Sequence, residues 1–322
     1  MNFTYLFGAG ASCKVLPMVN GLPPDFRDMA NKLNTIYRLS DENFIQLRGH
    51  NKAKVQDWLI NDLNNFADQA DRLTSIDTFA KKLYLNDNQD VLNQLKATLS
   101  AFMALKEAEN GTDYRYSAFY ASLLQRHVSD FPSNVQILSW NYDNQFERSY
   151  FDFSNGRILP NIYRKYRKTE REKEAFGIFQ INGATGYTWN DNSNFFPMHR
   201  TTPTLNLALV DQVVESYGHI TTQQSCQSGI SFGWERDNEI VKQVFEATQE
   251  TEILVVIGYS FPYFNREIDK KILANMNLRK IYFQSPEALK LKDRVKGIIN
   301  TNDIEIVPIH EDMNQFFLPY EL

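Results

Sequence analysis

The sequence predicts an α/β protein with a Rossmann-like parallel sheet that has helices on both faces. Three observations support this prediction. The chain begins with the short apolar run "NFTYL", which is followed at once by glycines. Near its end, the run "EILVVIG" (252–258) is almost continuously apolar, as is typical of a strand that is buried on both faces. Between them lies a long segment in which apolar residues recur at helical spacing.

Strands are expected wherever short apolar or β-branched runs occur between polar segments. Toward the end of the chain, such runs alternate with helical stretches, and this alternation is typical of parallel strands joined by crossover helices. The expected strands are residues 2–7, 135–140, 176–181, 252–258, 280–284 and 304–309, and the helices between the last three are residues 264–276 and 286–299.

A large helical insertion is expected after the first strand, over residues 25–130. Within it, "VQDWLINDLNNFADQADRL" places Leu59 and Leu63 on one face of a helix. Residues 185–235 are rich in Asn, Thr and Gln with weak periodicity, so they are expected to form an irregular loop region. We treat residues 1–322 as a single domain that contains both segments.

Composition limits the partners that the chain can have. Its 322 residues carry a net charge of −5, which gives no support for direct nucleic-acid binding. The one dense charge run, "YRKYRKTEREKEAF" (163–176), mixes both signs and is expected to be solvated. No stretch approaches the roughly 20 apolar residues that span a bilayer, so no membrane partner is expected.

The two cysteines, Cys13 and Cys226, indicate the compartment and exclude one kind of metal site. Two lone thiols in a chain of this size favour a reducing compartment, and a cytoplasmic location is expected. No C-x-x-C pair is present, so a four-cysteine zinc site is excluded, and no metal is expected.

The segment "FGAGASCKV" (7–15) follows the first expected strand directly and is the first candidate binding element. Gly8, Ala9 and Gly10 leave the backbone bare, which lets amide groups approach a phosphate, and Ser12 can add a hydroxyl hydrogen bond. A simple tight turn would give the same pattern, so both interpretations remain open at this point.

Three further junctions strengthen the ligand interpretation, because each is a strand end followed by small or polar residues. They are "LSWNYDNQFE" (138–147), "QINGATGY" (180–187) and "IGYSFPYFN" (257–265). Ligands of open parallel sheets bind at the carboxyl ends of the strands. These corners are therefore expected to meet in one crevice that is suited to a nucleotide-sized ligand with hydroxyls and phosphates.

At these junctions the sequence resembles a known family. "GAGAS", "GLPPDFR" (21–27), "SWNYD" (139–143), "INGATG" (181–186) and "IGYSF" (257–261) occur in the order found in sirtuin-like NAD-binding domains. The resemblance is greatest to the bacterial branch that acts in defence against phage, where a segment similar to "SIDTF" (75–79) is common.

The resemblance implies NAD as the ligand and gives each motif a role. The first loop would hold the pyrophosphate, the second strand end would contact the nicotinamide and its ribose, and the last two would contact phosphate, adenosine ribose and adenine. Phe26 and Arg27 echo the family's "PDFR", with Pro24 as an additional residue. The residues implied at the strand ends are, in that order, Gly8, Ala9, Gly10 and Ser12; Asn141 and Asp143; and Gly258, Ser260, Gln284 and Ser285.

Two departures from the family bear on the activity. The zinc module of deacylating sirtuins is absent, so the resemblance implies NAD hydrolysis rather than protein deacylation. The family's His–Gly pair, whose histidine acts as general base, is replaced here by Asn182–Gly183. Asn182 can orient a water molecule but cannot accept a proton. His199, His219 and Asp143 are the alternative candidates, although Asp143 is also suited to capping the following helix.

The leading hypothesis is therefore an enzyme that hydrolyses NAD to nicotinamide and ADP-ribose. Its transition state resembles an oxocarbenium ion, and a general base adds about 10²–10⁴-fold to the rate. Hydrolysis could therefore continue slowly without the usual histidine. The alternatives are a scaffold that binds NAD or ADP-ribose without turnover, and ADP-ribosyl transfer to a macromolecule. A dehydrogenase is disfavoured because the G-x-G-x-x-G spacing is missing.

The resemblance also implies how such an enzyme would be used. It would be an anti-phage effector that is held inactive until a phage signal arrives and that then depletes cellular NAD. The expected partners are further copies of the chain in a homo-oligomer, and a helicase-type ATPase or another component of the same defence system.

Overall fold

The structure is a computed structural model of the chain. It describes residues 1–40, 44–47, 50–163, 176–189, 192–194, 204–222, 225–235 and 239–322. Most of the charge run, residues 164–175, lies outside these ranges, as does His199. Among the described residues, no helix has the length and the apolar character needed to cross a membrane.

A seven-stranded sheet forms the centre of the fold, with the order β12-β11-β10-β1-β4-β6-β5 and every pair parallel. The predicted Rossmann-like parallel sheet is confirmed, and the short β5 is a strand that the sequence did not indicate. The strands are β1 (Phe3–Phe7), β4 (Val135–Ser139), β5 (Ile162–Tyr163), β6 (Gly177–Gln180), β10 (Ile253–Ile257), β11 (Lys280–Gln284) and β12 (Glu305–Ile309).

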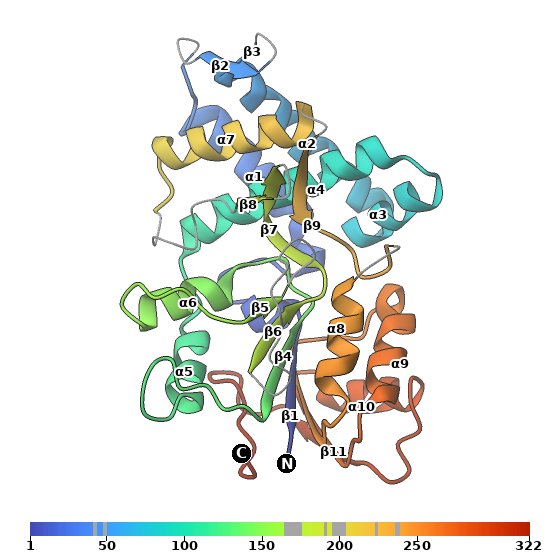
Figure 1. Cartoon of the computed structure of the whole chain (residues 1–322). Coiled ribbons are helices and arrows are strands. Elements are labelled where there is room, and N and C mark those ends of the chain that lie inside the picture. The colour runs from blue at the N-terminus through green and yellow to red at the C-terminus, as the bar shows by residue number, and fades with distance from the viewer. Residues whose placement is uncertain are drawn as a thin grey trace.

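The two faces of the sheet are buried by different helices, because side chains of a strand alternate between its faces. Phe3, Tyr5 and Phe7 pack with α5 and α6, whereas Leu6 packs in the core that includes α8, α9 and α10. Figure 1 shows the two groups of helices on opposite sides of the strands. Their bounds are α5 (Tyr114–Leu123), α6 (Gln145–Phe153), α8 (Glu239–Thr248), α9 (Arg266–Asn275) and α10 (Ala288–Lys296).

A third core lies in a helical lobe beyond the carboxyl ends of the strands, away from the labelled N-terminus (Figure 1). The predicted apolar face is confirmed, since Leu59 and Leu63 are fully buried. Phe26 meets Phe102 edge to face, with ring centroids 4.6 Å apart. The helices of the lobe are α1 (Leu22–Thr35), α2 (Lys52–Arg72), α3 (Ile76–Leu85), α4 (Gln89–Asn110) and α7 (Leu207–Thr222).

The insertion is less uniform than the sequence suggested. A small hairpin, β2 (Phe44–Leu47) and β3 (His50–Asn51), interrupts the helices. The last helix of the predicted range, α5, packs on the central sheet rather than in the lobe. The sequence pattern could not reveal this, because α5 is amphipathic in either position.

The expectation of an irregular region over residues 185–235 was wrong. This range contains most of a three-stranded antiparallel sheet and the whole of α7. The composition concealed these elements because the strands consist largely of small and polar residues, and because β7 pairs with β9, which is distant in sequence. The strands are β7 (Gly183–Trp189), β8 (Asn192–Asn194) and β9 (Cys226–Ile230).

Candidate functional site

The ends of four strands lie level at one edge of the sheet. Phe7 pairs with Ser139 of β4 on one side and with Ile257 of β10 on the other, and Ile257 pairs with Gln284 of β11. The loops that follow these strands therefore start side by side, as predicted, and they face the helical lobe (Figure 1).

The positions after β1 must be glycine chiefly because the loop after β10 packs directly against them. The Gly10 N–H donates to the carbonyl of Gly258 at 2.9 Å, and a Cβ on Gly10 would lie 2.8 Å from the Gly258 Cα. Gly258 has a φ of +61°, and a Cβ there would lie 2.4 Å from the Ala11 nitrogen. The Gly8 N–H also donates within the protein, to the carbonyl of Ile257. The glycines therefore let a ligand come close to the backbone of this loop, but the loop does not present a set of free N–H groups.

The loop continues as a single 3₁₀ turn, η1 (Ala9–Ser12), and the first α-helix starts only at Leu22. No α-helix N-terminus therefore lies directly behind the loop. Ala9 and Gly10 are half-exposed, whereas Ser12 is buried. The exposed part of this loop is thus its small-residue tip.

Four polar side chains meet where this turn faces the loop after β4. The Ser12 hydroxyl lies 2.8 Å from the Tyr116 hydroxyl and accepts from the Asn141 Nδ2 at 3.4 Å. The Asp143 carboxylate accepts from the Ser12 hydroxyl and from the Gln145 N–H. The structure therefore joins three predicted residues, Ser12, Asn141 and Asp143, in one buried network.

Asp143 has a raised pKa and also stabilises the start of α6. Burial raises its pKa to about 6, while the bond from Ser12 acts in the opposite direction. Its bond to the Gln145 N–H at 3.2 Å lies in the first turn of α6, although the N-cap residue itself is Asn144. Asp143 thus stabilises the start of this helix, as expected, from one position earlier than the cap.

Sequence reasoning did not identify Tyr116 and Glu107, both of which come from the helical insertion. Glu107 of α4 accepts from the Asn144 N–H at 2.7 Å, and its Oε2 lies 3.7 Å from Arg148 Nη1. Both charged side chains are almost completely buried. An acidic residue on the apolar face of a helix would have been the sequence signal for Glu107. The residue pattern of this helix does not show that signal.

Asn182 is engaged by the backbone at both ends of its amide. Its Nδ2 donates to the Trp140 carbonyl at 3.0 Å, and its Oδ1 accepts from the Gly233 N–H at 2.8 Å. These bonds join the loop after β4 to the segment after β9. Asn182 therefore lies beside the predicted crevice with a structural role.

The residues expected near adenine also have partners within the protein. The Gln284 amide donates to the carbonyls of Asp312 and Gln315 at 2.8 and 2.6 Å, and accepts from the Phe317 N–H at 2.9 Å. The Ser285 hydroxyl accepts from the Glu287 N–H just before α10. The exposed Ser260 accepts from Arg294 through its carbonyl, which leaves its hydroxyl available.

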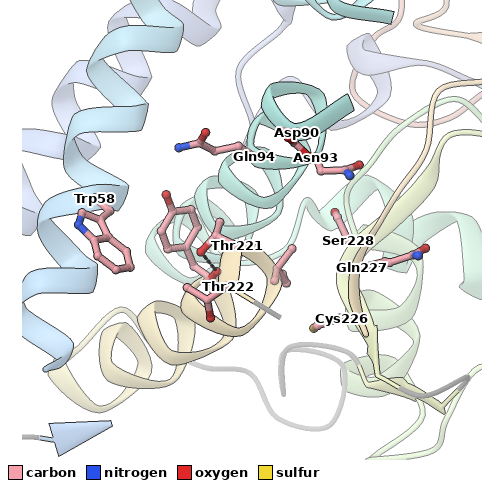
Figure 2. Close-up of a pocket in the computed structure, with 11 residues that line it drawn as sticks. Trp58, Asp90, Asn93, Gln94, Thr221, Thr222, Cys226, Gln227 and Ser228 are labelled. Carbon is pink, nitrogen blue, oxygen red and sulfur yellow. Dashed lines mark hydrogen bonds between the residues drawn. The ribbon is translucent and has the colours of Figure 1, made fainter. Parts of the chain in front are cut away.

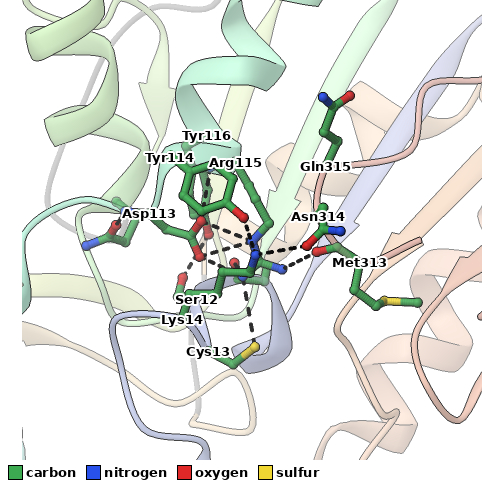
Figure 3. Close-up of polar contacts among 12 residues, drawn as sticks. Ser12, Cys13, Lys14, Asp113, Tyr114, Arg115, Tyr116, Met313, Asn314 and Gln315 are labelled. Carbon is green, nitrogen blue, oxygen red and sulfur yellow. Dashed lines mark hydrogen bonds and ion pairs between the residues drawn. The ribbon is translucent and has the colours of Figure 1, made fainter. Parts of the chain in front are cut away.

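The C-terminal segment lies against the loop after β1, as Figure 3 shows. Arg115 donates to the carbonyls of Ala11 at 2.7 Å and Met313 at 3.5 Å, and pairs with Asp113 at 2.6 Å. Lys14 donates to the Asn314 Oδ1 at 3.4 Å. Two cations thus lie next to the small-residue loop.

The structure gives Phe26 and Arg27 partners in the helical lobe. Phe26 is in the lobe core, and Arg27 pairs with Asp68 and Asp71 of α2 at 2.7 and 2.6 Å. His219 lies on α7, 3.9 Å from Glu215. The predicted candidate His199 lies outside the described residues.

A separate cavity of about 640 Å³ lies within the helical lobe. Figure 2 shows its lining, which mixes polar side chains with apolar and aromatic ones and comes from α2, α4, α7 and β9. None of the residues predicted from the sequence lines it. Among the described residues, no cluster of three histidine, cysteine or acidic side chains could hold a metal ion.

A buried carboxyl beneath the loop after β10 makes stability depend on pH. Asp269 accepts from the Tyr259 hydroxyl at 2.9 Å, and burial raises its pKa to about 8. Between about pH 4 and pH 8, the unfolded chain has lost this proton while the folded protein retains it, so rising pH lowers the free energy of unfolding. We expect Asp269→Asn to reduce this decline in urea unfolding measured across that range. An unchanged pH dependence would contradict the prediction.

Comparison with known proteins leaves the family open. No protein-family model matches the chain. No curated protein matches it either. The Rossmann-like parallel α/β fold is therefore shown by the structure itself, and the relation to sirtuins remains a prediction from the motifs.

Proposed function

We propose that the chain binds NAD at the carboxyl edge of its sheet and hydrolyses it to nicotinamide and ADP-ribose. The observation that supports this most directly is the continuous contact among three strand ends, from Gly258 through Gly10 and Ser12 to Asn141. Open parallel sheets bind nucleotides at this edge.

The pyrophosphate would lie on the small-residue tip of the loop after β1. Ala9 and Gly10 are half-exposed there, and the short side chains allow phosphate oxygens to approach the backbone. Lys14 and Arg115, which flank this loop, would offset the negative charge. The exposed Ser260 hydroxyl, at the next strand end, would contact phosphate or the adenosine ribose.

The nicotinamide ribose would lie against the loop after β4. Asn141 is held by Ser12, and Asp143 fixes Ser12 in turn, so the amide of Asn141 has a defined orientation before the ligand arrives. Groups that are already oriented lower the barrier, because little reorganisation is needed as positive charge develops on the ribose.

Replacing Asn141 by alanine tests the assignment. We expect Asn141→Ala to slow nicotinamide release by at least about a hundredfold, which is the usual cost of removing one oriented polar group. The melting temperature should change little, because the amide makes one long bond at 3.4 Å. Nicotinamide is measured by chromatography after incubation with NAD, with Asn64→Ala on the exposed surface of α2 as the control. A variant as active as wild type would contradict the site.

The second candidate function is an NAD-binding or ADP-ribose-binding scaffold without turnover. The engaged amide of Asn182 favours it, because this residue does not replace the missing histidine. Calorimetric titration with NAD, combined with the product assay, separates the two functions. Binding without nicotinamide would support the scaffold.

The cellular role that we propose follows the motif resemblance. The enzyme would act in the cytoplasm as an anti-phage effector, as a homo-oligomer or together with a helicase-type ATPase or another defence component. We expect nicotinamide release to increase when the product of a neighbouring gene is added, if that product carries the trigger.

A further inference from the structure

The segment "SIDTF" supplies a carboxylate close to the candidate site. Asp77 lies in the first turn of α3, after Ser75, whose hydroxyl caps the helix by accepting from the Thr78 N–H. The Tyr142 hydroxyl donates to Asp77 Oδ1 at 3.3 Å. Since Tyr142 lies between Asn141 and Asp143, this contact joins α3 to the loop after β4.

Aromatic packing holds α3 in this position. Phe232 and Trp234, which follow β9, stack with ring centroids 4.7 Å apart. Tyr142 meets Phe232 edge to face, and Tyr84 of α3 meets Trp234 in the same way. The intervening Gly233 is bonded to Asn182. One aromatic layer therefore links the end of α3 to the segment after β9 and to the loop after β4.

Asp77 also lies near the loop after β10. Burial is the main cause of the raised pKa of the Tyr259 phenol, the Asp269 charge adds to it, and the charge of Asp77 makes a smaller contribution; Tyr259 follows Gly258 directly. Tyr259 stacks on Trp140, the residue after β4, at a centroid distance of 5.8 Å. Asp77 is thus close to two of the three strand ends that form the proposed site.

Asp77 is better placed to accept a proton than Asp143 or Asn182. Asp143 is buried and accepts from both Ser12 and Gln145. Asn182 has no basic group, and its amide is engaged at both ends. Asp77 is partly buried, and Tyr142 is the hydrogen-bond donor that the structure gives it. Burial raises the pKa of Asp77 to about 6, and the bond from Tyr142 acts in the opposite direction.

We propose that Asp77 is the general base of the reaction, a role that rests on the proposed hydrolysis of NAD. The bond between C1′ and the nicotinamide nitrogen breaks, and its electron pair neutralises the pyridinium. A water oxygen forms the new bond to C1′, and the proton that it loses passes to the Asp77 carboxylate. Tyr142 orients that carboxylate by donating to its other oxygen. The products are nicotinamide, ADP-ribose and one proton.

The test separates proton transfer from structural support. Asp77→Asn should slow nicotinamide release by about 10²–10⁴-fold, with NAD affinity unchanged by calorimetry. Azide has no proton to lose when it attacks C1′. Adding azide to Asp77→Ala should therefore restore nicotinamide release and yield ADP-ribosyl azide, which mass spectrometry detects. Asp90→Asn is the matched control, because Asp90 is also acidic, lies in the first turn of α4 and is exposed.

Each outcome has a distinct meaning. Loss of hydrolysis with azide rescue supports the role of Asp77. An active wild type combined with an equally active Asp77→Asn, or with an inactive Asp77→Ala that azide does not rescue, overturns that role and leaves the proposed function standing. A wild type that binds NAD but releases no nicotinamide, alone or with its neighbouring gene product, overturns both.

Discussion

Replacing Glu107 by alanine is expected to lower the free energy of unfolding by about 3–5 kcal/mol, the usual cost of leaving a buried charge without its partner. Glu107 lies 3.7 Å from Arg148, and the two side chains are 0% and 1% exposed. The guanidinium nitrogens of Arg148 have no hydrogen-bond partner within the described residues. The negative charge of Glu107 therefore offsets the buried positive charge of Arg148. The Asn144 N–H would also lose its acceptor. Urea unfolding at pH 8 measures the change, since burial raises the pKa of Glu107 to about 7.

A surface ion pair provides the comparison. Asp71→Ala removes one partner of Arg27, where both side chains are well exposed to solvent, and should cost no more than about 1 kcal/mol. Glu107→Gln keeps an acceptor for the Asn144 N–H and should fall between the two variants. If Glu107→Ala were as mild as Asp71→Ala, Arg148 would not depend on Glu107 in the folded protein.

Gly258→Ala is expected to lower the free energy of unfolding by several kcal/mol and to abolish the NAD binding that we propose. The left-handed backbone at this residue alone costs about 1–2 kcal/mol for an L-residue. The added Cβ would also lie 2.4 Å from the Ala11 nitrogen and from the Gly10 carbonyl carbon. Because these are backbone atoms, no change of rotamer relieves the overlap, and the loops after β1 and β10 must separate. Urea unfolding and calorimetric titration with NAD measure the two effects.

Gly156→Ala distinguishes backbone strain from steric overlap. Gly156 has a φ of +94°, but the nearest atom to an added Cβ is Phe151 Cζ, 3.6 Å away. This variant should lose about 1–2 kcal/mol and bind NAD normally. Equal losses in the two variants would show that the contact between the strand-end loops does not determine the effect at Gly258.

The sequence predicted most of the sheet because buried parallel strands carry their own signal. "EILVVIG" is apolar at almost every position, and β10 is buried at all five of its residues. The junctions after β1, β4 and β10 followed from these strands, since parallel strands end at a common edge. Ser12, Asn141 and Asp143 could therefore be placed together before the fold was known.

The remaining features depend on contacts between distant parts of the chain. Tyr116 reaches Ser12 across 104 positions, and Glu107 reaches Asn144 across 37. An amide at a strand end can contact a ligand or another chain segment equally well, and at Gln284 the C-terminal segment provides the partners. The pattern of single residues does not distinguish these possibilities.

The position of β1 has a consequence for how the protein is made. It lies in the middle of the sheet, and Phe3 pairs with Val135 on one side and with Ile253 on the other. During synthesis β1 therefore cannot pair with β10 until about 250 further residues have been added. Such nonlocal pairing slows folding, so nascent chains should depend on chaperones that shield apolar segments until β10 emerges.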